Sequence, residues 1–546
     1  MRGLIRLAAA AIAIWATWQL IGQFDLWGDP LFLGVAVLVL LPTLFLVVAG
    51  LLRREVPGSI HASAIWLVSR PRIASWRTAH PQLTRWVIRR LADRPSGWPA
   101  TLLSGVAMVA WFIGFGSVLQ DILVNDPAAR ADVRVLHLLA TFRVPALGEP
   151  VRIAAGVINP LALSVFGLLV AVALMERPLR AIPFLSPAAA ALLAVLLDNV
   201  TPHPPLPDRF AVVAPVTGFP DPSLATFAAL LSTFLLVAWP RHWWSRALLI
   251  SAAILTVGLG MLDLAALGAA WFTDLWGGTL LGAGTACLLA ALARWLRIPR
   301  IPLPRTVAGL VVFLALLALL IGGGKAPAAQ TDFTAPSRER TRLVASSVDD
   351  QIVARLPHWS ETMTGRRIQP VSLILIGSRA SLEDAFLRSG WNIALPITPA
   401  SSWQIALNSL QGKPYETAPV SPDFLDGYPQ DWAVERQTDA SSVRARHHAR
   451  FWTSGLTLAD GTPIWVGNAS LDTNIELAPN FKFPTHHIDP AVDLERDNVA
   501  AGLVQAGAKR VREVQLVRPE AGSNAEGDLF FTYGKAIILQ VARTST

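Results

Sequence analysis

Two short motifs hold four of the ten histidines of this chain, and they contain the side chains best suited to chemistry. Arg446 to Trp452 (RHHARFW) is the first motif, and Thr485 to Asp489 (THHID) is the second. Imidazole and carboxylate groups hold zinc and similar divalent ions, and a bound ion can activate water. The candidate catalytic residues are therefore His447, His448, His486, His487 and Asp489. Three of them are also candidate ligands of a divalent metal, namely His448, His487 and Asp489.

The alternating geometry of a β-strand favours other roles for the same residues. Successive side chains of a strand point to opposite faces, so His447 and His448 cannot enter one site. His448 would share its face with Arg446, Arg450 and Trp452, three candidate ligand-binding residues that suit a phosphate or sugar-phosphate group. Asp489 suits a helix cap. Because the histidine spacing matches no zinc signature, metal chemistry, anion binding and a purely structural role all stay open.

The elements that must position these residues divide near Gly322. The chain has 546 residues and is 53% hydrophobic, and apolar runs of about 20 residues, the length that crosses a bilayer, occur only before this point. We predict nine membrane spans, at about residues 1–24, 31–52, 99–120, 156–176, 181–197, 222–239, 247–270, 275–293 and 306–322.

The basic residues indicate how these spans are oriented. Nineteen arginines lie in the connections on one side of the predicted spans, nine of them in residues 53–98, and five lie on the other side. Cytoplasmic loops carry the excess of Lys and Arg, so we expect a cytoplasmic N-terminus and an extracytoplasmic C-terminal domain at the plasma (inner) membrane. The net charge of +8 is explained by this pattern, and we expect no nucleic-acid partner. The lone cysteine, Cys287, permits no intrachain disulfide.

The sequence thus predicts a polytopic α-helical membrane protein with a C-terminal soluble α/β domain. Two N-terminal spans and an Arg-rich loop occupy residues 1–98, a membrane domain occupies 99–298, and a last span with a flexible linker occupies 299–339. The soluble domain occupies residues 340–546. Its predicted strands lie at 371–377, 451–458, 462–468, 513–517, 529–533 and 536–541.

Three local signals predict the connections in the soluble domain. Asp460-Gly461 predicts a β-hairpin between the second and third of those strands. Ser381 to Asp384 predicts the capped start of a helix that stops at Gly390, and a further helix is expected at residues 402–410. Asp489-Pro490 predicts the start of an amphipathic helix with Gly507 after its end.

The soluble part resembles the LssY C-terminal domain family, a domain often joined to membrane modules and of uncertain activity. The resemblance covers about residues 340–520, and the two His-His motifs make it specific. Gly427-Tyr428 stands where the family pattern has Gly-Arg. The other matching residues are 371–377, Gly390-Trp391, 418–420, 465–467, Asp472 and 489–497.

The spacing of residues 198–278 resembles the type-2 phosphatidic-acid phosphatase superfamily. That family carries Lys-x6-Arg-Pro, then Pro-Ser-Gly-His, then Ser-Arg-x5-His-x3-Asp, and its last histidine attacks phosphorus while the final aspartate orients it. Here the three places are occupied by residues 196–207 (LLDNVTPHPPLP), 219–227 (FPDPSLATF) and 262–278 (LDLAALGAAWFTDLWGG). The resemblance implies a phosphatase-like helical bundle over about residues 100–295.

The reactive positions of this pattern are replaced. Only Asp274 matches, and Ala270 stands where the nucleophilic histidine belongs. Asp198 replaces the lysine, Pro205-Leu206 replaces Arg-Pro, residues 221–223 replace Ser-Gly-His, and Asp263 replaces the serine of the third motif. Phosphoryl transfer needs a nucleophile, an acid and a cationic clamp. Carboxylates such as Asp198 and Asp263 stand at these positions instead, and they would repel a phosphate group. A pair of like charges costs about 4 kcal/mol at about 4 Å in an effective dielectric of about 20.

These observations predict a membrane protein with an inactive lipid-phosphatase fold that binds or handles envelope lipid, such as a phospholipid or polyprenyl phosphate. His203, between two prolines, is expected to be a loop residue. A cavity between the spans could hold a lipid tail, or the spans could simply pack together. A metal-dependent hydrolase with its site in the C-terminal domain is one alternative, and an atypical lipid phosphatase is another. Transport is less favoured, since the spans lack paired charges.

Overall fold

The computed structural model describes residues 98–542 with short gaps, and a few residues between 75 and 84. Most of residues 1–98, including the predicted spans at 1–24 and 31–52, lies outside the described residues. The gaps are residues 126, 202, 216–217, 239, 241, 296–298, 324, 337–342, 346, 399–400, 402, 405–406, 409–413, 439–445, 478–483 and 526.

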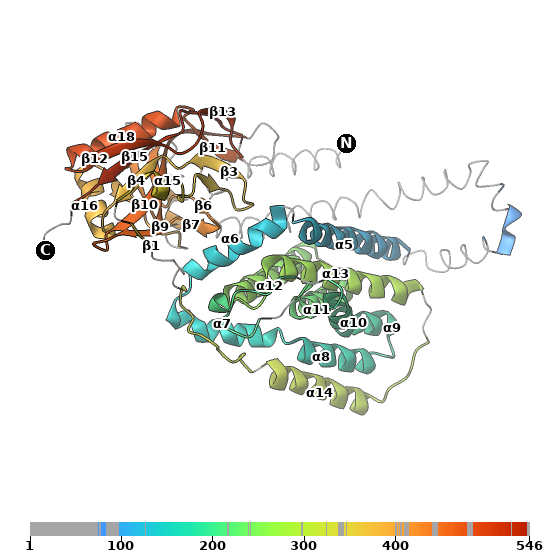
Figure 1. Ribbon diagram of the computed structural model, residues 1–546. Coiled ribbons are helices and arrows are strands. Elements are labelled where there is room, and N and C mark those ends of the chain that lie inside the picture. Colours follow the sequence, from blue (N-terminus) through green and yellow to red (C-terminus); the bar gives the residue numbers. More distant parts are fainter. Residues whose placement is uncertain are drawn as a thin grey trace. The chain divides into compact units, whose positions relative to one another are not determined.

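The described residues form two compact units. Residues up to Asp132 and Leu139–Pro336 belong to the first unit, and Val133–Leu138 and Ser337–Thr546 belong to the second. The first unit is helical and the second combines strands with helices (Figure 1).

Six apolar helical stretches of the first unit are long enough to cross a membrane, which agrees with an integral membrane protein. They are Ser104–Val124, Pro145–Ala173, Pro178–Asp198, Trp244–Ala266, Phe272–Arg294 and Arg305–Gly323. The helices that contain them are α5 (Trp98–Val124), α7 (Pro145–Val157), α8 (Pro160–Ala173), α9 (Pro178–Ala181), α10 (Ser186–Asp198), α12 (Trp243–Ala266), α13 (Phe272–Trp295) and α14 (Arg305–Gly323). The same unit contains α6 (Pro127–Thr141), which begins in it, and the 3-10 turns η2 (Ile182–Leu185) and η3 (Asp208–Phe210).

Helix α11 (Pro222–Val237) differs from the span predicted at 222–239. It has 16 residues, fewer than a bilayer crossing needs, and eight of them are buried. It packs against α8, α10, α12 and α13, and Figure 1 shows it among these helices. Its apolar sequence is therefore satisfied by protein contacts on several sides, and the predicted count of nine spans is not confirmed.

The predicted span at 156–176 is interrupted near its start. α7 ends at Val157, and α8 begins after Asn159, whose side-chain oxygen accepts a hydrogen bond from the Ala162 backbone N–H at 3.0 Å. Pro160 is the first residue of α8. An N-cap followed by proline restarts a helix at this point, because proline fits the first turn and cannot continue the preceding helix.

Small residues bring α11 and α13 into backbone contact. A Cβ atom on Gly278 would lie 2.4 Å from the Asp221 carbonyl oxygen, and one on Gly282 would lie 2.1 Å from the Ala225 carbonyl oxygen. Only glycine permits this approach, which is the small-residue packing used by helices in lipid. At Gly278 and Gly282, α11 and α13 therefore pack directly together, with no cavity between them at these two positions.

The second unit is built on a nine-stranded mixed sheet with the order β12-β15-β4-β10-β9-β8-β5, to which β1 and β11 are added. A four-stranded sheet (β3-β2-β6-β7) and a β13-β14 hairpin accompany it. The strands are β1 (Leu343–Ala345), β2 (Trp359–Glu361), β3 (Arg367–Pro370), β4 (Leu373–Ile376), β5 (Asn392–Ile393), β6 (Phe424–Leu425), β7 (Tyr428–Pro429), β8 (Trp432–Gln437), β9 (Arg446–Leu458), β10 (Pro463–Leu477), β11 (Pro484–Ile488), β12 (Lys509–Gln515), β13 (Glu520–Ser523), β14 (Leu529–Thr532) and β15 (Lys535–Gln540).

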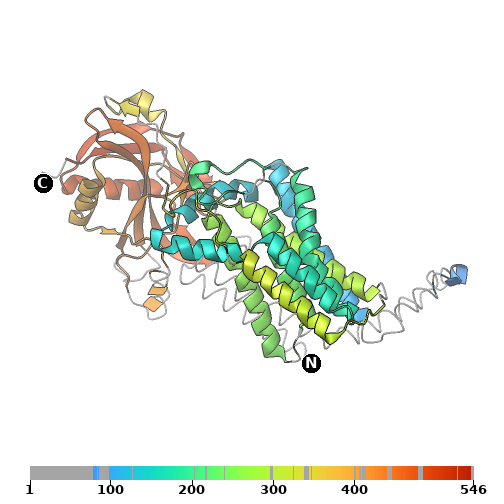
Figure 2. The same cartoon turned by 90° about the horizontal axis from the view of Figure 1, so that it is seen from below.

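Alternating side chains give the large sheet two buried faces. Leu373 and Leu375 of β4 join a core that includes residues of the helices α16 (Arg379–Arg388) and α18 (Val492–Gln505). Ile374 and Ile376 join the opposite core, to which β6 and the short helix α15 (Asp350–Val353) contribute. A strand buried on both faces is continuously apolar, which explains the run Leu373–Ile376. Figure 2 shows the twist of this sheet.

The predicted strands, the hairpin at Asp460-Gly461 and the helix after Asp489-Pro490 are confirmed. Several predicted boundaries are wrong: β9 begins at Arg446 and not at 451, β10 runs to Leu477 and not to 468, and β12 is Lys509–Gln515 and not 513–517. The predicted start of the helix at Ser381 is also wrong. The cap of α16 is Ser378, whose hydroxyl accepts from the Ser381 backbone N–H at 3.1 Å, so the helix begins before Ser381. Parts of the helix expected at 402–410 lie outside the described residues.

Candidate functional site

The two histidines of the first His-His motif point to opposite faces of β9, as the strand pattern predicted. Trp452 belongs to one core, whereas Ala449 and Phe451 belong to the other. His448 contacts Asp472 and Ser470, and His447 contacts Glu495. The motif therefore serves two separate clusters.

The cluster on the His448 side is a buried charge network. The Arg446 guanidinium lies 3.0 Å from Glu435 Oε2 and 3.5 Å from Asp472 Oδ2. Glu435 also accepts from the Ala418 backbone N–H at 2.6 Å. Burial raises the pKa of Glu435 to about 7, against the opposing effect of Arg446 and of the Ala418 N–H. Desolvation is thus the dominant influence on this carboxyl group.

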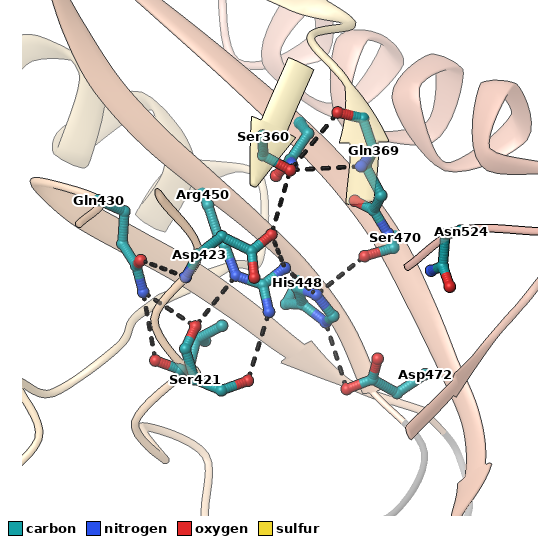
Figure 3. Close-up of polar contacts among 12 residues, drawn as sticks. Ser360, Gln369, Ser421, Asp423, Gln430, His448, Arg450, Ser470, Asp472 and Asn524 are labelled. Atoms are coloured by element: carbon teal, nitrogen blue, oxygen red, sulfur yellow. Dashed lines mark hydrogen bonds and ion pairs between the residues drawn. The ribbon is translucent and has the colours of Figure 1, made fainter. Parts of the chain in front are cut away.

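His448 is held on both ring nitrogens (Figure 3). Its Nε2 atom lies 2.7 Å from Arg450 Nη1 and 2.8 Å from Ser470 Oγ, and its Nδ1 atom lies 3.3 Å from Asp472 Oδ2. A guanidinium can only donate, so Nε2 accepts and the ring is neutral. Burial lowers the pKa of His448, and the Arg450 and Arg446 charges act in the same direction.

The small sheet closes this network from its other side. Asp423 Oδ2 lies 3.7 Å from Arg450 Nη1 and accepts from Ser360 Oγ at 3.3 Å. The Arg450 Nε atom donates to the Ser421 carbonyl oxygen at 3.1 Å. Asn468 of β10 donates to Ser360 Oγ at 3.0 Å. Figure 3 shows Ser360 of β2 and Asp423, which precedes β6, beside His448 and Arg450 of β9, so the network joins the two sheets.

Arg446, Arg450 and Trp452 do not form the open basic surface that would bind a phosphate group. Their residue exposures are 3%, 7% and 1%, and both guanidinium groups are paired with carboxylates. A ligand here would have to replace those contacts and their buried hydrogen bonds. The geometry supports an internal structural role, in which removing one partner is costly because the other charge stays buried.

Among the described residues, no metal site is seen around His448 or Asp489. Among the described residues, no group of three His, Cys, Asp or Glu side chains is placed to hold a metal ion. The Nε2 lone pair of His448 is occupied by Arg450 and Ser470. Asp489 accepts from the Ala491 backbone N–H at 2.8 Å, a turn before α18. The side chains of His486 and His487 lie outside the described residues, although β11 places their backbone opposite Ile475 and Asn474 of β10.

The cluster on the His447 side is more open. His447 Nδ1 lies 2.9 Å from Glu495 Oε2, and the exposed fractions of the two side chains are 20% and 7%. The ring packs edge-on against Trp391, with 6.2 Å between centroids. Arg436 stacks on the same indole, its Cζ 4.9 Å from the ring centroid. The sequence marked His447 but gave no sign of Glu495 or Arg436 as its partners.

In the membrane unit, Asp274 is paired with a histidine from another loop. His203 Nδ1 lies 2.8 Å from Asp274 Oδ1, and Asp274 is completely buried. Asp274 Oδ2 accepts from the Trp271 backbone N–H at 3.3 Å. Trp271 Nε1 donates to the Pro204 carbonyl oxygen at 2.6 Å, which holds the loop next to His203. His203 was expected to be a loop residue only, but its ring pairs with the buried carboxylate of Asp274.

A second carboxylate faces the other ring nitrogen. Asp132 Oδ2 of α6 lies 4.0 Å from His203 Nε2. Both Asp132 oxygens also accept from Thr273, one from its backbone N–H at 2.9 Å and the other from its hydroxyl. Burial lowers the pKa of His203, but the hydrogen bond to Asp274 and the charges of Asp274 and Asp132 outweigh it, so that pKa is raised. The imidazole lies between two acids.

Three of the other positions compared with the phosphatase pattern have structural contacts, and a fourth, Asp263, does not have a partner for one oxygen within the part of the chain that the structure describes. Ala270, which the resemblance in sequence sets against the attacking histidine of the phosphatases, belongs to the apolar core of this unit. Asp221 caps α11, accepting from the Leu224 backbone N–H at 2.6 Å. The Asp198 carboxylate packs on Gly218, where a Cβ atom would lie 1.3 Å from its Oδ1. Asp263 Oδ2 is buried with no hydrogen-bond partner among the described residues.

Comparison with known proteins supports the assignment of the C-terminal part. No curated protein and no solved structure matches the chain. Residues 353–536 match the family model described as LssY C-terminus, so the resemblance of the soluble domain to that family is confirmed.

Proposed function

We propose that this protein is an integral membrane protein that binds envelope lipid and does not cleave phosphate esters at the Asp274 site. The observation that carries the proposal is the charge of that site. Among the described residues, His203 is the only basic side chain that forms an ion pair with Asp132 or Asp274. Asp198 adds a further like charge that acts on Asp274. Such a site disfavours a phosphate group, whose charge needs cationic donors around it.

The geometry of His203 supports the same proposal. An imidazole that attacks phosphorus must present a free nitrogen to an anion. His203 presents Nε2 toward Asp132, at 4.0 Å, so an incoming phosphate would meet a carboxylate beside the attacking atom. We therefore assign the Asp132–His203–Asp274 group to holding α6, the 199–221 loop and the start of α13 together.

The same charges favour a lipid whose headgroup carries no net negative charge. A zwitterionic headgroup brings an ammonium group that can face carboxylates, whereas phosphatidic acid brings only anionic oxygens. The resemblance to the phosphatase superfamily supports a lipid-handling role at this end of the helices. In this proposal the protein lies in the plasma membrane, its N-terminus is cytoplasmic, and its LssY C-terminal domain is extracytoplasmic.

Lipid retention tests the proposal. The full-length protein is extracted with native lipid, and the bound lipid is measured by native mass spectrometry. We expect phosphatidylethanolamine to be retained in preference to phosphatidic acid. Asp132→Asn removes one charge without changing shape and should raise the share of phosphatidic acid, while Asp208→Asn, outside the cluster, is the matched control. Preferential retention of phosphatidic acid by the unaltered protein would contradict the proposal.

A further inference from the structure

The strongest unassigned group of side chains lies in the soluble domain, on the face of the sheet that α18 covers. Arg436 of β8 and His447 of β9 are direct cross-strand partners. Their neighbours Val434, Ala449 and Phe451 belong to the core beneath α16 and α18, so both side chains project to that side. Cross-strand partners on one face lie within about 5.5 Å of each other at Cβ. A guanidinium and an imidazole are thus held side by side.

Glu495 fixes the orientation of the imidazole. Its Oε2 atom lies 2.9 Å from His447 Nδ1, and the carboxylate is itself 7% exposed. A carboxylate accepts a proton donor, so Nδ1 carries the hydrogen. Nε2 then points away from Glu495, and among the described residues it has no hydrogen-bond partner. The His447 side chain is 20% exposed, so the ring is not fully enclosed by the described residues.

Trp391 and Asn498 fix the guanidinium. The Cζ atom of Arg436 lies 4.9 Å above the Trp391 ring, which is almost completely buried and therefore rigid. Arg436 Nη2 donates to Asn498 Oδ1 at 3.1 Å, and Asn498 Nδ2 donates to Glu495 Oε1 at 3.2 Å. One chain of contacts therefore links Arg436 to His447. Stacking on indole and a single side-chain acceptor leave the other guanidinium N–H groups for a ligand.

We propose that Arg436 and His447 form a binding site for a phosphate-type anion. The Glu495 carboxylate is committed to His447 and Asn498, so the groups left for a ligand are the Arg436 guanidinium and the His447 Nε2 atom. A fixed guanidinium matches the oxygen geometry of phosphate, and the imidazole Nε2 atom can accept a hydrogen bond from a phosphate hydroxyl. On the opposite face, Arg446 and Arg450 cannot do this, because carboxylates already pair with them.

Two sources could supply such an anion, namely a lipid headgroup or a free phosphate compound. The full-length protein in nanodiscs of phosphatidylcholine is titrated with inorganic phosphate by calorimetry. A second titration measures binding of the detergent-solubilised protein to phosphatidylcholine vesicles with and without phosphatidic acid. Binding of inorganic phosphate assigns the site to free phosphate compounds, and binding only to vesicles that contain phosphatidic acid assigns it to a lipid headgroup.

Four variants locate the site. Arg436→Gln should weaken binding at least about tenfold, the loss expected for one charge-assisted contact. His447→Asn keeps a donor to Glu495 but lacks Nε2, so it should also weaken binding, whereas His447→Gln, whose amide reaches the Nε2 position, should retain part of it. Arg510→Gln, at an exposed arginine paired with Glu513 on β12, is the control and should bind as the unaltered protein does.

Two results would overturn the proposal. One is the absence of binding in both titrations with the unaltered protein. The other is binding that Arg436→Gln leaves unchanged, or that Arg510→Gln weakens equally. Neither result bears on the lipid site of the membrane unit, because no residue is shared between the two.

Discussion

Two buried histidines of this protein respond to their surroundings in opposite ways. His448 touches Arg450 and its pKa is lowered, whereas His203 lies between Asp274 and Asp132 and its pKa is raised. Burial acts in the same direction on both, disfavouring the charged ring. At His448 burial outweighs the opposing charge of Asp472 and is helped by the arginines, whereas at His203 the two carboxylates together outweigh burial.

The raised pKa of His203 predicts a pH dependence of stability. Its contribution is complete below the ordinary value of 6.5 and is lost as pH rises through the higher folded value. His203→Gln should lose about 3 kcal/mol at pH 6, because both carboxylates lose their cation. Thermal unfolding of the solubilised protein at pH 6 and pH 9 measures this. An equal loss of stability between those pH values in both proteins would contradict the ion pair.

The raised pKa of Glu435 predicts that the stability of the soluble domain also falls as pH rises. Its folded pKa of about 7 exceeds the ordinary 4.5, so stability is lost as pH rises between these values. The loss is at most about 3 kcal/mol. Glutamine cannot ionise, so Glu435→Gln should abolish this pH dependence of stability. The measurement is amide-exchange protection of β8 and β9 at pH 5 and pH 8, and a variant that keeps the full dependence would show that another group is responsible.

At the scale of elements, close packing of α11 on α13 predicts which glycines cannot be replaced. Gly282→Leu would drive a side chain into the Ala225 carbonyl oxygen and should cost about 3 kcal/mol or more. Gly309 of α14 has no atom within 4 Å of its Cβ position, so Gly309→Leu should be neutral or slightly stabilising. Thermal unfolding in detergent compares them, and equal losses would contradict direct packing of the two helices.

Local patterns predicted the long apolar helices and six of the described strands, but not β8, which carries Glu435 and Arg436, and few of the side-chain partners. Alternation along RHHARFW placed His447 and His448 on opposite faces, because strand geometry depends on adjacent residues alone. The pairing of His203 with Asp274 joins residues 71 positions apart, and loop conformation decides it. His447 and Glu495 are likewise distant in sequence, so no local pattern predicts their contact. The burial of Arg446 and Arg450 depends on the small sheet, which no local pattern reveals.

For the whole molecule, the arginine distribution predicts an extracytoplasmic soluble domain. Cys287 is the only cysteine and is buried, so Cys287→Ser gives a background for labelling. In that background, Asp460→Cys at the β9–β10 hairpin should react with an impermeant maleimide in intact cells. Ser96→Cys, in the Arg-rich loop, should react only after permeabilisation. The reverse labelling pattern would show that the soluble domain is cytoplasmic and would contradict the prediction.

The most direct test of the central claim is phosphate release from phosphatidic acid and from a polyprenyl diphosphate. We predict that the purified protein in nanodiscs releases no phosphate above the background of empty nanodiscs, because Asp132 and Asp274 lie on both sides of His203 where a phosphate would need cationic donors. Phosphate release that disappears in both Asp274→Asn and His203→Gln would contradict this account, since it would make the histidine and aspartate a working nucleophilic pair.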